Sequence, residues 1–177
     1  AEMVETLLDL ERIKLRDFQR SSSLVDLPEL ARERTAFLAS GGEREIRFSG
    51  EPGLVVRGDA ALLVRVVDNL VGNALKFAPG EPVDVAVGPA GGESVCLTVR
   101  DRGPGIPPGE REEIFRRFAR GGSAAAVPGL GLGLALVAEI VRWHGGRIDV
   151  EAPGSGGSLF RVTLPAAGGG VEPRRRT

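Results

Sequence analysis

The chain has no tyrosine and only one cysteine, one methionine, one tryptophan and one histidine among its 177 residues. Because Cys96 is the only cysteine, no disulfide can form within the chain, which fits a reducing compartment. No apolar run approaches the ~20 residues that a membrane helix needs, and no signal-peptide pattern opens the sequence. Lysine is also scarce, since only Lys14 and Lys76 occur among 23 basic residues. A lysine inside a motif is therefore notable.

The charge balance is close to neutral, with a formal net charge of −1. Such a balance gives no argument for binding nucleic acid or a membrane surface, so we expect neither partner for this chain. Hydrophobic residues make up 42% of the sequence. That content suits one soluble, compact domain of roughly 140 to 150 residues with short flanking segments.

The first 20 residues predict an amphipathic helix, because their apolar side chains are mostly three or four positions apart. These residues are Val4, Leu7, Leu8, Leu15 and Phe18. A helix with one apolar stripe needs a partner helix to cover it. Since the sequence begins inside this pattern, we expect the chain to be a fragment of a longer protein.

The remaining sequence predicts an α+β fold, a two-layer sandwich with helices on one face of a mixed, mostly antiparallel sheet. Asp26 or Ser23 is expected to cap the first of its helices, and Asp59 the second. A segment rich in glycine and small residues, 119–130, predicts a mobile loop. Helices are expected near 28–39, 59–77, 110–118 and 131–144, and strands near 44–48, 54–57, 83–88, 94–101, 147–152 and 158–165.

Four short blocks follow one another in the middle of the chain, and the first is DNLVGNALKFAP at 68–79. Asn69 and Asn73 are four residues apart, so they share one face of the predicted helix. An unpaired buried amide costs about 1 to 3 kcal/mol. These amides therefore either bond to the backbone of a neighbouring loop or, in the case of Asn73, give an oxygen to Mg²⁺. Asp68 is adjacent but rotated by ~100° away from that face, so it is only a lesser candidate for a catalytic base.

The second block, DRGPGI at 101–106, places Asp101 at the end of an apolar strand. Read alone, this carboxylate could be a solvated turn residue, a helix cap or a ligand-binding group. The third block, EEIFRRFAR at 112–120, contains Phe115 and Phe118, which we expect to be core anchors.

The fourth block, GLGLGLALV at 129–137, is neither a dinucleotide-binding fingerprint nor a Walker A loop, because it lacks the third glycine and the G-K-[ST] ending. Its alternating glycines precede an apolar helix, so they would leave backbone N–H groups open for a phosphate. The alternative is a tight hinge without any ligand contact. His144 ends the same helix, and we expect it to be structural.

In this order the blocks resemble the N box, first glycine box, F box and second glycine box of the ATP-binding domain of sensor histidine kinases. That family belongs to the ATPase group that includes gyrase, Hsp90 and MutL. The resemblance implies a Bergerat-type fold that binds Mg²⁺ and ATP. It also implies transfer of the γ-phosphoryl group to a histidine, from which an aspartate of a response regulator takes it.

The resemblance also implies roles for individual residues. Asn73 would bind Mg²⁺, Lys76 would reach the phosphates, and Asn69 stands where related ATPases carry a catalytic glutamate. Phe77 would flank the adenine, whose exocyclic amine would donate to Asp101. Leu130 departs from the family, which usually has threonine there. The remaining nucleotide contacts would come from Gly103, Gly105, Ile106, Arg120, Gly129, Leu130, Gly131, Leu132, Gly133 and Leu134.

The same resemblance divides the chain into a remnant of the phosphoacceptor hairpin (1–22), the ATP-binding domain (23–167) and a disordered tail (168–177). The hairpin helix of the same receptor, which forms a homodimer at full length, and a response regulator would be the partners. We expect a cytoplasmic location, with the full receptor anchored in the inner membrane, and no self-phosphorylation, because the acceptor histidine is missing. The alternatives are a nucleotide-binding regulatory module without transferase activity, an anti-sigma-type serine kinase, or a MutL-type ATPase.

Overall fold

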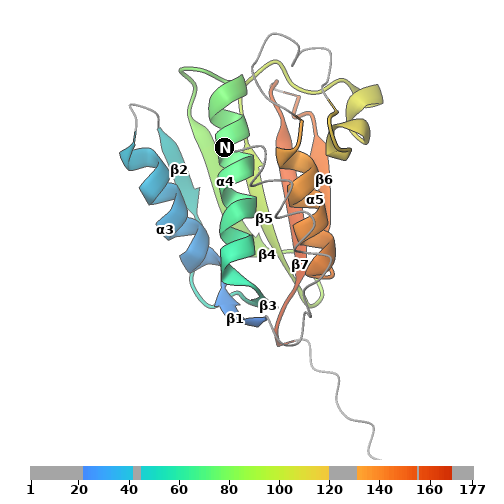
Figure 1. The fold of residues 1–177 in the computed structure, drawn as a ribbon. Helices are drawn as coiled ribbons and strands as arrows, with labels where there is room; N and C mark the ends of the chain where they lie inside the picture. The colour runs from blue at the N-terminus through green and yellow to red at the C-terminus, as the bar shows by residue number, and fades with distance from the viewer. Residues whose placement is uncertain (1–21, 42–44, 120–130, 155, 169–177) are drawn as a thin grey trace, which may run out of the picture.

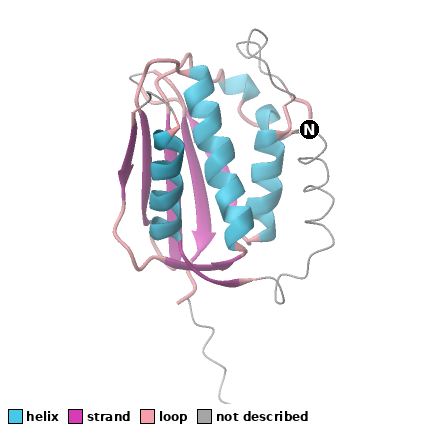
Figure 2. Cartoon of the chain, turned by 60° about the vertical axis from the view of Figure 1, so that its left-hand side comes forward, coloured by secondary structure: helices cyan, strands magenta, loops and turns pink. Residues whose placement is uncertain are grey.

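The computed structural model describes residues 22–41, 45–119, 131–154 and 156–168. Within these ranges, three helices lie side by side on one face of a five-stranded sheet (Figures 1 and 2). The predicted helix over residues 1–20 and nearly all of the predicted loop and tail lie outside them. The helices are α3 (Leu27–Ser40), α4 (Ala60–Phe77) and α5 (Gly133–Trp143).

The large sheet has the order β2-β4-β5-β7-β6, and only the β2–β4 pair is parallel. Two short strands, β1 and β3, form a separate antiparallel pair at one end of the molecule (Figure 1). The predicted sandwich, with a mixed, mostly antiparallel sheet and helices on one face, is therefore confirmed. The strands are β1 (Ser23–Asp26), β2 (Ile46–Ser49), β3 (Val55–Gly58), β4 (Val83–Pro89), β5 (Ser94–Arg100), β6 (Arg147–Glu151) and β7 (Leu159–Pro165).

Two aspartates start the first two helices, as the sequence predicts. Asp26 Oδ1 accepts a hydrogen bond from the Glu29 amide at 3.0 Å at the start of α3. Asp59 Oδ1 accepts from the amides of Ala61 and Leu62 at 2.9 and 3.2 Å at the start of α4. These bonds satisfy N–H groups that the first turn of a helix leaves without a partner.

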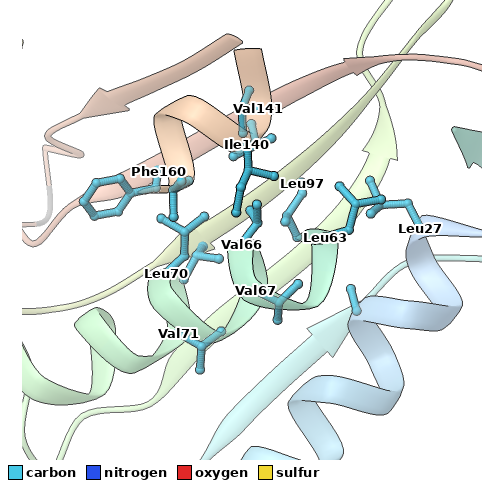
Figure 3. Packing of buried hydrophobic residues seen from close by; sticks show 14 of the residues in the cluster. Leu27, Leu63, Val66, Val67, Leu70, Val71, Leu97, Ile140, Val141 and Phe160 are labelled. Carbon is cyan, nitrogen blue, oxygen red and sulfur yellow. The ribbon is translucent and has the colours of Figure 1, made fainter. Parts of the chain in front are cut away.

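Helix α4 supplies the centre of the core, because its apolar residues follow a helical period. They pack against the sheet, against α5 and against the start of α3 (Figure 3). The polar residues of the helix lie on its other face. Five apolar residues of α4 are each at most 1% exposed: Leu63, Val66, Val67, Leu70 and Val71. In the described part of the chain, no helix is both long enough and apolar enough to cross a membrane.

The segment predicted as a helix over 110–118 forms two short 3₁₀ turns instead, η1 (Pro108–Glu110) and η2 (Glu113–Phe115). The second turn cannot continue as an α-helix. Arg116 leaves the helical region with φ −82° and ψ 151°, and Phe118 adopts a left-handed φ of 62°. Short 3₁₀ turns of this kind are usual connectors between regular elements.

The prediction that Phe115 and Phe118 both anchor the core is half right. The Phe115 ring packs edge-on against Phe160, with centroids 6.5 Å apart and an interplanar angle of 88°. Phe118 is 61% exposed, so it is not a core residue. Its left-handed backbone turns the chain away from the core after η2, which the spacing of the two phenylalanines does not indicate.

His144 joins the end of α5 to the start of α4. Its ring is buried, its Nδ1–H donates to the Ile140 carbonyl at 2.8 Å, and Nε2 accepts from the Asp59 amide at 3.1 Å. An imidazole that accepts at one nitrogen and donates at the other is neutral. A Cβ on Gly58 would lie 2.5 Å from the ring, so a glycine is needed there. The predicted structural role of His144 is confirmed.

This arrangement predicts a pH-dependent stability. Burial lowers the pKa of His144 below its ordinary value of 6.5, so the folded chain binds fewer protons than the unfolded chain just below that pH. The contribution is therefore complete above about pH 6.5 and is lost as the pH falls toward the pKa of the folded state, at up to about 1.4 kcal/mol per pH unit.

Urea unfolding between about pH 7.5 and 5.5 measures this effect, and it can be assigned because the chain has no second histidine. In His144→Gln the slope of stability against pH should be nearly flat over that range. An equal slope in both proteins would contradict the assignment.

Candidate functional site

The blocks found in the sequence meet at one end of the molecule. The last turn of α4, the segment 101–106 that follows β5, and the first turn of α5 all lie toward the upper end in Figure 1. The turn between β6 and β7 joins them, because the Asp101 amide donates to the Ser158 carbonyl at 2.9 Å. Four segments that are distant in sequence therefore contribute to one site.

Asp101 is the buried charge of this site, with 4% of the residue exposed. Its Oδ1 accepts hydrogen bonds from the amides of Gly103 at 2.9 Å and Ser158 at 3.1 Å. From the described residues, Oδ2 receives no hydrogen bond. The side chain is thus neither a solvated turn residue nor a helix cap. One oxygen fixes its direction, and the other remains available to a donor.

The two glycines after Asp101 are required by close approaches within the protein. A Cβ on Gly103 would lie 2.6 Å from the Phe77 carbonyl. Gly105 has φ +77°, and its Cβ would lie 3.0 Å from the Gly157 carbonyl. These close approaches to Phe77 and Gly157 are contacts within the protein that the sequence analysis did not predict, and contact of the two glycines with a bound nucleotide stays a prediction.

The turn between β6 and β7 is a part of the site that the sequence analysis missed. Gly157 has φ +80°, and a Cβ there would lie 2.0 Å from the Asp101 carbonyl. The only signal in the sequence is the glycine-rich run at 154–157. That run indicates a turn, but it gives no reason to place the turn against a carboxylate 57 residues earlier.

The polar residues of α4 differ in which groups they contact. Asn69 Nδ2 donates to the Arg65 carbonyl one turn earlier at 2.8 Å, and a Cβ on Gly133 would lie 2.5 Å from its Oδ1. Its amide is thus held against the first turn of α5. Asn73 is partly exposed, and its side chain makes no hydrogen bond with the residues described here. The Lys76 ammonium is 5.8 Å from the centre of the Phe77 ring, a cation–π distance.

Asp68, the lesser candidate for a catalytic base, is occupied by an ion pair. Arg34 of α3 donates to both of its oxygens, through Nε at 2.5 Å and Nη2 at 2.9 Å. A forked pair of this kind is a strong, directional contact. Asp68 therefore fastens α3 to α4, which weakens the case for a role in proton transfer.

The fourth block is only partly described, since Gly129 and Leu130, like Arg120, lie outside the described residues. The Phe118 amide donates to the Gly131 carbonyl at 3.0 Å, which ties the two flanks of that segment together. Leu132 is buried and Leu134 packs partly on the core. If Leu132 contacts a nucleotide, it must do so through its backbone, whereas the Leu134 side chain is partly exposed.

Two features bear on anion and metal binding. Helix α5 starts at Gly133 with no side-chain cap, so the N–H groups of its first turn face the site without a competing carboxylate. Among the described residues, no cluster of three or more His, Cys, Asp or Glu side chains could hold a metal. Asn73 of α4, the metal ligand predicted from the sequence, has a side-chain oxygen of the kind that Mg²⁺ prefers, and its metal role stays a prediction.

Known proteins are similar to this chain in sequence and in fold. Residues 58–168 match the family described as histidine kinase-, DNA gyrase B-, and HSP90-like ATPase. The chain is 40% identical over 165 residues to the sensor protein KdpD of Escherichia coli (strain K12). The matched region covers 92% of this chain and 18% of that protein. The chain therefore spans only about a fifth of the length of that curated relative.

Two solved structures extend the comparison. The mycobacterial sensor histidine kinase MprB matches with a TM-score of 0.73 and 33% identity, over 81% of this chain and 97% of that one. Full-length ShkA, in complex with AMPPNP, matches with a TM-score of 0.78 and 27% identity, over 93% of this chain and 35% of that one.

The turn beside Asp101 yields a prediction about stability. Gly157→Ala should destabilise the fold by about 1 to 3 kcal/mol more than Gly156→Ala does. Both positions have a left-handed φ, of +80° and +87°, so both variants share the backbone strain. Only the new Cβ at position 157 meets the Asp101 carbonyl, since nothing lies within 4 Å of one at 156. Urea unfolding of the two variants measures the difference, and equal losses would contradict the close packing.

Proposed function

The chain belongs to the family of histidine kinase-, DNA gyrase B- and HSP90-like ATPases, and on this premise we propose that its site binds ATP with Mg²⁺ for transfer of the γ-phosphoryl group to a histidine. The observation that carries the proposal is the Asp101 carboxylate, which is buried and held by one oxygen while the other is open. An ionised carboxylate only accepts hydrogen bonds. It therefore favours a base with an amino group, as adenine has.

Residues beside Asp101 would form the rest of the base site. Phe77 and Ile106 are both partly buried. Ile106 packs against the core, and the Phe77 carbonyl lies close to Gly103. Gly103 and Gly105 carry no side chain that could block a flat ring. A bound adenine would gain from apolar contact with Phe77 and Ile106 and from one charge-assisted hydrogen bond to Asp101.

The phosphates would lie between α4 and α5. Lys76 is exposed in the last turn of α4, where its ammonium can neutralise phosphate charge. The uncapped first turn of α5 offers backbone N–H groups. Arg120, Gly129 and Leu130 remain predicted contacts on the same side of the nucleotide. The fit is one of chemistry, since an anion here would meet the backbone donors of α5 and the Lys76 ammonium.

The protein's contribution to the reaction would be positioning and charge neutralisation, as in phosphoryl transfer generally. Asn73 would hold Mg²⁺ by its side-chain oxygen, and the ion would supply the charge that stabilises the phosphoryl group during its transfer. Asn69 cannot accept a proton as a carboxylate would, and Asp68 is paired with Arg34. Neither residue thus suits a general base, which agrees with a nitrogen nucleophile that needs little activation.

The acceptor histidine would lie outside these 177 residues. His144 is the only histidine in the sequence, and both of its ring nitrogens are engaged within a buried setting. We therefore propose the hairpin helix of the same receptor, dimeric at full length, as the acceptor, and a response-regulator aspartate as the next recipient. Transfer to a separately supplied hairpin would exclude a purely regulatory nucleotide-binding module.

Asp101→Asn tests the proposal directly. The amides of Gly103 and Ser158 still require an acceptor, so the new side chain should turn its oxygen to them and its NH₂ group to the base. ADP with Mg²⁺ should then bind about 50- to 100-fold more weakly, because a donor facing a donor costs about 2 to 3 kcal/mol. Isothermal titration calorimetry measures this loss.

Two further arms make that experiment specific. IDP carries a carbonyl where adenine carries its amine, so its affinity should fall less than that of ADP, or rise. The control is Asp149→Asn, which removes a 55% exposed carboxylate on β6 and should bind like the wild type. If the folded wild-type chain fails to bind ADP at millimolar concentration, the proposal is wrong.

The metal role of Asn73 gives a separate prediction. In the wild type, Mg²⁺ should strengthen ADP binding, and in Asn73→Ala most of that gain should disappear while binding in EDTA stays similar. The reason is that the alanine variant lacks the oxygen ligand but keeps the base site intact. Titrations with and without Mg²⁺ measure the difference. A variant that keeps the full Mg²⁺ gain would remove Asn73 from the metal site.

A further inference from the structure

Arg102 stands between Asp101 and Gly103 and reaches away from the site to strand β4. Its Nη1 donates to the Pro82 carbonyl at 2.5 Å, and its Nη2 donates to Asp84 Oδ2 at 2.6 Å. One guanidinium thus grips a backbone carbonyl and a carboxylate at the start of β4. The sequence analysis did not single it out, because an arginine beside a glycine motif resembles any exposed cation.

The segment that Arg102 anchors has no regular secondary structure of its own between residues 101 and 106. On one side it is held to the turn between β6 and β7, through Asp101 and Ser158. At its far end Arg111 Nε donates to the Ile106 carbonyl at 3.3 Å. Arg102 supplies the tie on the remaining side. A loop without regular secondary structure depends on such ties to keep one conformation.

The charges around Asp84 show what this tie does beyond neutralisation. In the register of the sheet, Asp84 is paired with Arg47 on β2 and with Arg100 on β5. The Asp84 carboxylate therefore has cations on both neighbouring strands even without Arg102. Arg47 is itself bonded to Glu45, at 2.7 and 3.2 Å. Of these arginines, Arg102 is the one that belongs to the segment carrying Asp101. Its bond to Asp84 therefore fixes the position of that segment in addition to neutralising the carboxylate.

The pair is also partly shielded from solvent. The Arg102 and Asp84 side chains are 31% and 34% exposed, whereas those of Arg47 and Glu45 are 54% and 62% exposed. A forked, half-buried arginine holds its geometry better than an exposed pair, which is mobile and screened. Arg47 and Asp84 lie on the neighbouring strands β2 and β4, but only the Arg102–Asp84 pair includes a residue of the 101–106 segment.

We propose that Arg102, through Pro82 and Asp84, is a positioning residue for nucleotide binding that keeps the open oxygen of Asp101 aimed at the base. This inference rests on the proposed function of the site. It adds a grip on β4 to the ties made by the Asp101 side chain itself. Loss of these bonds would let residues 102 and 103 shift. The shift would weaken binding of the amino group of the base while the protein stays folded.

The test compares ADP and IDP binding by calorimetry in the wild type, Arg102→Met, Arg102→Lys and Asp84→Asn. In Arg102→Met, ADP affinity should fall about fivefold to tenfold, because a misaligned carboxylate loses part of a charge-assisted hydrogen bond. IDP affinity should change little, so the preference for ADP over IDP should fall by a similar factor. Arg102→Lys should lie between, since an ammonium can keep one of the two contacts. The double variant with Asp84→Asn should lose less than the sum of the single losses.

Arg47→Met is the matched control, because it removes a guanidinium from the same cluster without touching residues 101–106, and it should keep wild-type ADP affinity and preference.

If Arg102→Met lowers only the unfolding midpoint and keeps both the ADP affinity and the ADP preference, Arg102 is a stabilising residue and the inference is wrong. If the wild type shows no ADP binding, or Asp101→Asn binds as tightly as the wild type, the proposed function fails, and this inference falls with it. Wild-type binding with an unaffected Arg102→Met refutes the inference alone.

Discussion

The site depends on the hydrogen bonds that Asp101 Oδ1 accepts from the amides of Gly103 and Ser158. A carboxylate that is almost wholly buried is costly unless donors surround it. These two amides reduce that cost, and they also decide which oxygen remains open. Much of the local structure serves this arrangement, from the missing side chain at Gly157 to the antiparallel pairing that brings Ser158 beside the end of β5.

The opposite ends of the helices are joined by a different kind of contact. His144 links the end of α5 to the cap of α4 with a neutral ring, while the ends near Asp101 are polar and open toward the site. The Arg34–Asp68 fork holds α3 to α4 midway along that helix. The helix layer is therefore fastened at one end and in the middle. This leaves the last turn of α4 and the first turn of α5 able to meet a ligand from fixed positions.

Family membership and local chemistry support one another without being the same argument. The family match indicates an ATPase fold, but it does not say why these residues would discriminate between bases. The held carboxylate gives that reason. Under the proposal, Arg102 would contribute to such a site without contacting the ligand, because its bonds to Pro82 and Asp84 hold the backbone next to Asp101.

Much of this protein could be predicted from local sequence. The caps at Asp26 and Asp59 and the apolar period of α4 each depend on neighbouring residues, so local rules suffice for them. That His144 is structural could also be predicted from its place at a helix end, but its bond to the Asp59 amide, 85 positions away, could not. The 3₁₀ turns at η1 and η2 and the exposure of Phe118 could not be read this way, because the backbone there follows how the chain leaves the core.

The sequence by itself determined the three α-helices, the strands of the large sheet, their order and the blocks that form the site. Only the tertiary structure decided which oxygen of Asp101 is open, that Gly157 lies against its carbonyl, that Asp68 is paired with Arg34, and that Arg102 grips β4. The physical reason is that each of these contacts joins residues 18 to 57 positions apart. Sheet register and helix packing set such contacts, and spacing along the chain does not.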